Sequence, residues 1–261
     1  MDNIFIVLPL WATMLIVTGV VAGAAVGLQA TIRRLLPEVL ARRHNDVAGF
    51  LVAVVGVIYA VTVGFIIAQQ WDEFTDAKDR SYREAFTLAA VAESSAVLGE
   101  REHRRYVEAV LDYNRAVLAG WEHQDRSDER AGLREAQSLD PLYRLLAEAR
   151  PDTEAQRAFV QEAVGRLGQV ADDREERLHR AGTAHLEWPL WVLVAFATVV
   201  VLVFCALFGL ESPWLHYTMI SGVALAVAGN LLLVILLNHP LSGPLRVEPD
   251  SYASVVRELS G

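Results

Sequence analysis

Two glutamate–histidine pairs, each spaced three residues apart, are the residues in this sequence whose types could bind a metal. They are Glu100 with His103 and Glu176 with His179, and on a helix this spacing puts both side chains on one face. In a four-helix bundle, two such pairs together with two further glutamates form a di-iron site. However, three arginines flank the first pair and the surrounding sequence is dense in charge. We therefore expect solvated helix faces, with no metal and no cofactor.

A row of arginines at 174, 177 and 180 could contact lipid phosphates or an acidic partner. Pairing with the acidic residues at 172, 173, 175 and 176 is the interpretation we favour, because oppositely charged side chains three or four residues apart attract on a helix. The sequence has no phosphate-binding loop, nucleophile elbow or zinc-protease motif. We therefore predict that the protein is not an enzyme.

Four stretches of the chain contain no Asp, Glu, Lys or Arg: residues 4–30, 47–70, 188–210 and 213–237. Apolar runs of about 20 residues are typical of membrane-spanning helices. We therefore predict an all-α integral membrane protein with two pairs of transmembrane helices, within residues 1–70 and 188–237. Its first partner is the lipid bilayer. The net charge of −9 and the pI of about 5.3 argue against a nucleic-acid partner.

The charges are concentrated in residues 71–187, a region with a net charge of −8 that we expect to be a helical extramembrane insert. Residues 238–261 form a C-terminal tail. Apolar periodicity predicts that the second span continues as a helix to Gly99, followed by a helix over 101–120. Asp140-Pro141 has the pattern of a helix start. Thr153 and Gln156 fit a capping box that opens a long helix through Arg180.

The second span carries small residues at steps of three and four, which keeps them on one helix face. This stripe can serve packing inside one subunit, packing between subunits, or the lining of a pore. Its members are Gly49, Ala53, Gly56, Ala60, Gly64 and Ala68.

Few polar side chains lie at membrane depth. The polar residues within the spans that could have a function are Tyr59, Thr62 and Asn230. We expect each of them to form a hydrogen bond between helices. Ionisable residues, which mark proton relays and coupled transporters, are absent from three spans, and the fourth has only His216 near one end. The sequence thus leaves a passive pore, a sensor or a scaffold.

The distribution of positive charge does not decide the orientation. The loop between the first two spans carries four arginines, whereas the opposite side carries eight basic residues close to the membrane. The total places the insert and both termini in the cytoplasm, but the denser short loop argues for the reverse.

Three separated motifs stand out: residues 44–50 running into 54–61 and Trp71, residues 83–85, and residues 237–249 with Ser251. Together they resemble the bestrophin-like family of four-span membrane proteins. Residues 188–191 also look like the family. The residues we assign to family motifs are His44, Asn45, Asp46, Glu84, Arg177, Pro240 and Gly243. Leu241 stands where the family more often has an aromatic residue.

The resemblance implies a homo-oligomer, by analogy with bestrophins a pentamer, in a bacterial-type plasma membrane. The insert and both termini would be cytoplasmic, and the second span would line a pathway for inorganic ions. Phe50, Val57 and Phe65 would then form hydrophobic constrictions. The residues assigned to pore lining or packing are Gly49, Phe50, Ala53, Gly56, Val57, Tyr59, Ala60, Thr62, Gly64, Phe65 and Ala68.

The negative charge of the insert is not what we expect of a chloride channel, because a net charge of −8 concentrates cations. The alternative function, from a different class, is a membrane-anchored sensor or signalling scaffold that binds a ligand or partner with its helical insert.

Overall fold

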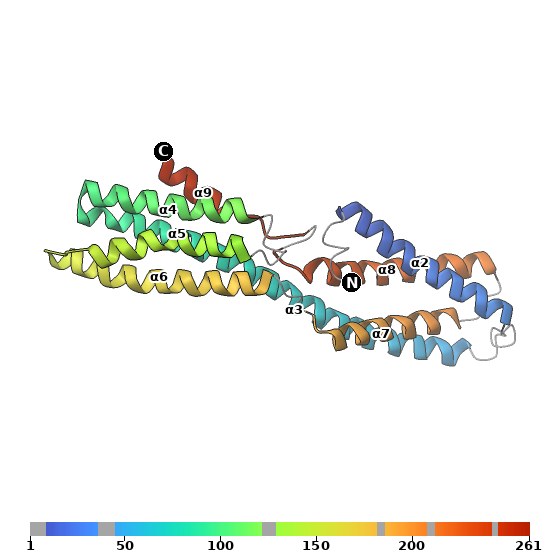
Figure 1. Ribbon diagram of the computed structural model, residues 1–261. Coiled ribbons are helices and arrows are strands. Elements are labelled where there is room, and N and C mark those ends of the chain that lie inside the picture. The colour runs from blue at the N-terminus through green and yellow to red at the C-terminus, as the bar shows by residue number, and fades with distance from the viewer. Residues whose placement is uncertain (1–8, 36–44, 122–128, 182–185, 208–211, 242–244) are drawn as a thin grey trace. The chain divides into compact units, whose positions relative to one another are not determined.

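The computed structural model describes residues 9–35, 45–121, 129–181, 186–207, 212–241 and 245–261 (Figure 1). Every regular element in these residues is a helix, which confirms the all-α prediction. The residue contacts divide the chain into two units. The membrane unit contains α2, α7, α8 and the part of α3 up to Glu73. The helical unit contains α3 from Phe74 onward, η2, α4, α5, α6 and α9.

Four helices are long and apolar enough to cross a membrane, as the charge-free stretches predict. They are α2 (Leu10–Leu35), the first part of α3 (Asn45–Ser94), α7 (Trp188–Ala206) and α8 (Pro213–Leu237). The helix α2 runs on past residue 30, where the apolar stretch ends, because Arg33 and Arg34 stabilise its last turn. Positive side chains there interact favourably with the helix dipole.

Small side chains and one polar pair hold α2 against its neighbours. Ala25 of α2 and Ala224 of α8 are fully buried in the same core, and small residues let helix backbones approach closely in lipid. At one end, Gln29 and His216 place Nε2 and Nδ1 2.9 Å apart. This contact joins α2 to α8 through a buried hydrogen bond, in addition to the packing of their small side chains.

The helical unit is a bundle whose helices lie side by side (Figure 1). Its elements after α3 are η2 (Ser95–Leu98), α4 (Glu100–Gly120), α5 (Glu129–Glu148), α6 (Glu154–Ala181) and α9 (Asp250–Ser260). Gly99 separates η2 from α4 with a φ of 96°, a conformation that glycine adopts without the steric cost of a Cβ. The predicted helix end at Gly99 and the predicted helix over 101–120 are confirmed.

The predicted apolar stripes form the core of this bundle. Ala85, Leu88 and Ala92 of α3 are fully buried. Tyr106, Val110, Tyr113 and Val117 of α4 have at most 1% of their surface exposed. Side chains at these spacings share one face of a helix, so burying both faces accounts for the packing of α3 against α4.

The capping box at the start of α6 is confirmed, since the Gln156 backbone N–H donates to Thr153 Oγ1 at 3.2 Å and the Thr153 N–H donates to Gln156 Oε1 at 3.3 Å. The predicted helix start at Asp140-Pro141 is wrong, because Pro141 lies inside α5. The apolar face of α5 continues through the proline: Leu139, Leu142 and Leu146 are all buried. Packing of that continuous face outweighs the hydrogen bond that proline removes.

Candidate functional site

One face of the α3 span packs against the rest of the membrane unit. Its buried residues are Tyr59, Val63, Ile66 and Gln70, with 5%, 1%, 7% and 2% of their surfaces exposed. Steps of four, three and four residues keep these side chains on one side of a helix. The packed face therefore includes Tyr59, one of the residues assigned from sequence to pore lining or packing.

The opposite face of α3 is open. Phe50, Val57 and Phe65 are 69%, 63% and 74% exposed, and at 3.6 residues per turn they lie away from the buried Val63. The apolar window of α3 is also the least buried of the four, at 17% against 22%, 28% and 39%. Within one chain, the apolar window of α3 therefore has the smallest share of buried residues among the four spans.

The small-residue stripe belongs largely to this open side. Ala53, Ala60, Gly64 and Ala68 are exposed, and Gly49 and Gly56 are half-buried. A methyl group added to Gly56 or Gly64 would meet no atom within 4 Å. Close packing inside one subunit therefore does not account for the absence of a side chain at Gly56 and Gly64.

The structure brings together two of the three polar residues noted in the spans. The Tyr59 hydroxyl is turned toward Thr198 of α7 and Asn230 of α8, although within the described residues it makes no hydrogen bond of ordinary geometry. Thr62 is half-buried. Tyr59 and Asn230 thus lie near one another where three spans meet, and the expected hydrogen bonds between helices stay a prediction.

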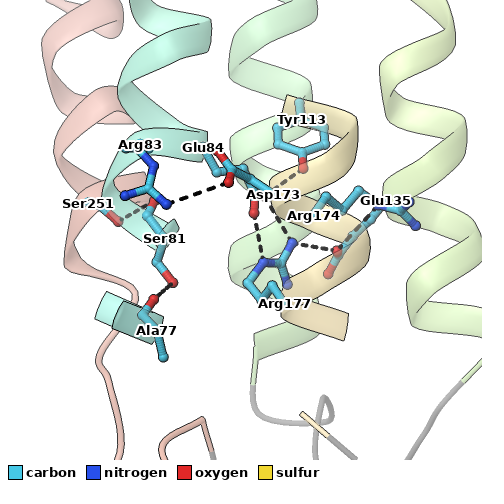
Figure 2. Close-up of polar contacts among 10 residues, drawn as sticks. All are labelled: Ala77, Ser81, Arg83, Glu84, Tyr113, Glu135, Asp173, Arg174, Arg177 and Ser251. Atoms are coloured by element: carbon cyan, nitrogen blue, oxygen red, sulfur yellow. Dashed lines mark hydrogen bonds and ion pairs between the residues drawn. The ribbon is translucent and has the colours of Figure 1, made fainter. Parts of the chain in front are cut away.

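In the helical unit, Arg177 lies at the centre of a buried ion cluster (Figure 2). Its Nε and Nη2 donate to the two carboxylate oxygens of Glu84 at 2.9 Å each, and Nη2 also donates to Glu135 Oε2 at 2.8 Å. The Tyr113 hydroxyl donates to Glu84 Oε1 at 2.6 Å. The three charged side chains are at most 2% exposed. This cluster therefore joins α3, α4, α5 and α6 through charge-assisted hydrogen bonds.

The electrostatics of the cluster keep Arg177 charged and Tyr113 protonated. Burial opposes the charge of Arg177, but Glu84, Tyr252 and Glu135 outweigh it and raise the pKa of the guanidinium well above its ordinary value. Burial, reinforced by the negative Glu84, raises the pKa of Tyr113 well above its ordinary value. The phenol is thus a hydrogen-bond donor to a carboxylate.

Aromatic rings complete the surroundings of Arg177. Its guanidinium carbon lies 5.6 Å from the centre of the Trp121 ring and 5.9 Å from that of Tyr252. These are favourable cation–π distances. Trp121 Nε1 also donates to the Val247 carbonyl at 3.2 Å. The cluster therefore holds the C-terminal helix α9 in the bundle and performs an anchoring role.

Comparison with known proteins identifies the family. The bestrophin-like domain matches residues 19–252, which is most of the chain. The chain belongs to the bestrophin-like family. Its four apolar helices make it an integral membrane protein of that family.

Solved structures share the fold of this bestrophin-like chain. One variant of a bacterial bestrophin homolog from Klebsiella pneumoniae is 13% identical, with a TM-score of 0.64 over 94% of this chain and 96% of the other. A second variant is 16% identical, with a TM-score of 0.64 over 95% and 96%. A variant described as a membrane protein is 14% identical, with a TM-score of 0.67 over 95% and 96%. No curated protein matches the chain.

The residues assigned to family motifs lie in different parts of the bestrophin-like chain. The sequence assigned Glu84 and Arg177 to family motifs without giving them a role. They form the buried ion pair described above. Pro240 is buried and its carbonyl accepts a hydrogen bond from the Val247 N–H at 2.8 Å. Asn45 and Asp46 begin α3, and His44 and Gly243 lie outside the described residues.

The two glutamate–histidine pairs cannot share a metal centre. His103 Nδ1 lies 2.9 Å from Ser95 Oγ, near η2. Gln156 of α6 reaches the same end of the bundle, where it donates to the Val97 carbonyl. Glu176 is twenty positions farther along α6, about 30 Å at 1.5 Å per residue. In the described residues no group of three acidic, histidine or cysteine side chains could hold a metal ion.

Glu135 is the member of the cluster that sequence reasoning missed, and Arg177 pairs with partners other than its acidic neighbours in α6. A signal was present, because Glu135 falls on the apolar face of α5 with Leu139 and Leu142. An acidic residue on a buried face needs a cationic partner.

Proposed function

We propose that this protein assembles as a homo-oligomer in which the α3 spans line a pathway for inorganic ions. The observation that carries the proposal is the open face of α3, with small residues and with Phe50, Val57 and Phe65 projecting from it. A surface of this kind suits a central pathway, where small side chains leave room and large apolar ones form constrictions. By analogy with bestrophins, five copies would surround the pathway.

The proposed orientation places the helical unit and both termini in the cytoplasm. Val164 on α6 is 55% exposed in the helical unit, so Val164→Cys in a Cys205→Ala background reports its side of the membrane. We expect a membrane-impermeant thiol reagent to label this variant in permeabilised cells and not in intact cells. Labelling of intact cells would contradict this orientation and favour the sensor or scaffold function.

Conduction is tested with the purified protein in planar bilayers under ion gradients. We expect discrete currents from a preparation whose oligomeric state has been measured by light scattering or native mass spectrometry. A folded oligomer that carries no current under gradients of several cations and anions would contradict the proposal. A folded monomer would contradict it as well.

A further inference from the structure

The residue that follows α8, Asn238, has two hydrogen-bond donors on its side-chain oxygen. Gln70 Nε2 donates to Asn238 Oδ1 at 3.3 Å, and the Leu186 backbone N–H donates to the same oxygen at 2.9 Å. Asn238 and Gln70 are 3% and 2% exposed. One carbonyl oxygen therefore connects the end of α8 to the α3 span and to the segment that leads into α7.

Both donors need this oxygen. A backbone N–H buried at the start of a membrane helix has no water to bond with, so leaving it without an acceptor destabilises the fold. The same reasoning applies to the side-chain amide of Gln70, which is buried at the end of the packed face of α3. Replacing the oxygen by an apolar group would leave two buried donors unpaired.

The contact differs in kind from the others on the packed face of α3. Val63 and Ile66 contribute apolar packing, which has no preferred direction, and the Tyr59 hydroxyl closes no hydrogen bond of ordinary geometry within the described residues. The bond from Gln70 is directional. On a helix with 3.6 residues per turn, a shift by one position turns the open face by about 100°.

We propose that Asn238 is a positioning residue that fixes the rotation of α3 about its axis. It holds Gln70 toward α8, so that Phe50, Val57 and Phe65 stay on the open face. The rotation is measured within the membrane unit, and its consequence for ion passage rests on the proposed function. The tail motif that contains Asn238 thereby acquires a physical role.

Two substitutions at position 238 separate the effect of the oxygen acceptor from the effect of side-chain size. Asn238→Asp, studied at a pH low enough to keep this buried carboxyl group protonated, keeps an oxygen that accepts both donors, whereas Asn238→Leu has a similar size and accepts neither. Leu237→Ala is the matched control, because Leu237 is 1% exposed. Its truncation weakens packing at the neighbouring position and leaves the acceptor in place.

The test measures the rotation directly by pulsed electron paramagnetic resonance. Spin labels are attached at Val57→Cys and Leu225→Cys in a Cys205→Ala background, in full-length protein diluted with unlabelled chains in nanodiscs. Both positions are exposed, at 63% and 53%, so the labels disturb little packing.

The protein with Asn238 intact, the Asn238→Asp variant and the Leu237→Ala variant should give one narrow distance distribution. Asn238→Leu and Gln70→Leu should each shift or broaden it. An unchanged distribution in a folded Asn238→Leu variant would overturn the inference, as would equal broadening in Leu237→Ala. The readout needs no current, so a non-conducting protein would contradict the proposed function and leave this result intact.

Discussion

Arg177 and Glu84 are 93 positions apart in the chain and share two hydrogen bonds of 2.9 Å inside the helical unit. Glu84 belongs to α3, the same continuous helix that begins at Asn45 in the membrane unit. Arg177 belongs to α6 and lies against the rings of Trp121 and Tyr252. The pair therefore attaches the continuation of the second span to α6 and to the C-terminal helix.

Replacing Arg177 should destabilise the protein strongly. Arg177→Ala leaves Glu84 and Glu135 buried without their cation, which costs about 3–5 kcal/mol. Arg177→Lys should lose less stability than Arg177→Ala but remain less stable than the unmodified protein, because an ammonium cannot form the bidentate hydrogen bonds of a guanidinium. The measurement is denaturant or thermal unfolding of the detergent-solubilised protein, followed by circular dichroism.

The matched control is Arg166→Ala, also on α6. Arg166 pairs with Glu162 at 2.6 Å, but the two side chains are 33% and 61% exposed. Exposed pairs of this spacing contribute about 0.3–0.5 kcal/mol. Equal losses for the two arginine variants would contradict the buried role of Arg177.

The hydroxyl of Tyr113 should contribute measurably to stability. It donates to the carboxylate of Glu84, which is paired with Arg177, at 2.6 Å in a fully buried position, and a hydrogen bond to a charged group contributes about 1.5–3 kcal/mol. Tyr113→Phe should lower the free energy of unfolding by that amount. Tyr143→Phe is the control, because Tyr143 is 42% exposed and its hydroxyl donates to a backbone carbonyl at 3.3 Å. A similar loss in both variants would show that the charge of Glu84 is unimportant.

Asp173 should make stability depend on pH. Burial raises the pKa of Asp173 above its usual value, although Arg83 lies 3.7 Å away. A carboxyl group with a raised pKa in the folded state favours folding below its ordinary pKa of about 4 and loses that contribution as the pH rises through the raised value.

Asp173→Asn stays neutral at every pH. We therefore expect it to raise the thermal midpoint relative to the unmodified protein at pH 7 and to have a smaller effect at pH 4. Thermal unfolding across this range checks the sign. A midpoint that falls at pH 7 would mean that the ion pair with Arg83 dominates.

Two glycine substitutions should have opposite effects. Gly99 has a φ of 96° and a ψ of 162°, a region essentially restricted to glycine where a side chain costs about 1–3 kcal/mol, so Gly99→Ala should destabilise the turn between η2 and α4. Gly165 lies exposed inside α6 with no atom within 4 Å of an added methyl group. Gly165→Ala should stabilise α6 by about 0.5–1 kcal/mol. Unfolding midpoints that move in the same direction would refute this difference.

Local patterns were sufficient to predict the elements whose signals lie within a few residues. The charge-free stretches predicted four spans, the apolar spacing predicted the buried faces of α3 and α4, and Thr153 with Gln156 predicted the start of α6. Pro141 failed as a boundary because packing of the α5 face, a tertiary effect, overrode a local one.

The partners of Arg177 could not be predicted from its surroundings in the sequence. Acidic residues beside it in α6 satisfied the usual spacing rule, but Glu84 and Glu135 come from α3 and α5. A pairing across 93 and 42 positions depends on how helices pack. Likewise, the small residues of α3 showed a common face, but only the structure showed that this face is open.

The most direct test of the central claim is chemical modification of the open face of α3 during conduction. Val57→Cys, in a Cys205→Ala background, is treated with a charged thiol reagent in a planar bilayer. Phe196→Cys on α7, 66% exposed, serves as the control on a different span. The account predicts that modification at Val57 changes the current and that modification at Phe196 does not. A current that is insensitive at Val57, or equally sensitive at both positions, would contradict a pathway lined by α3.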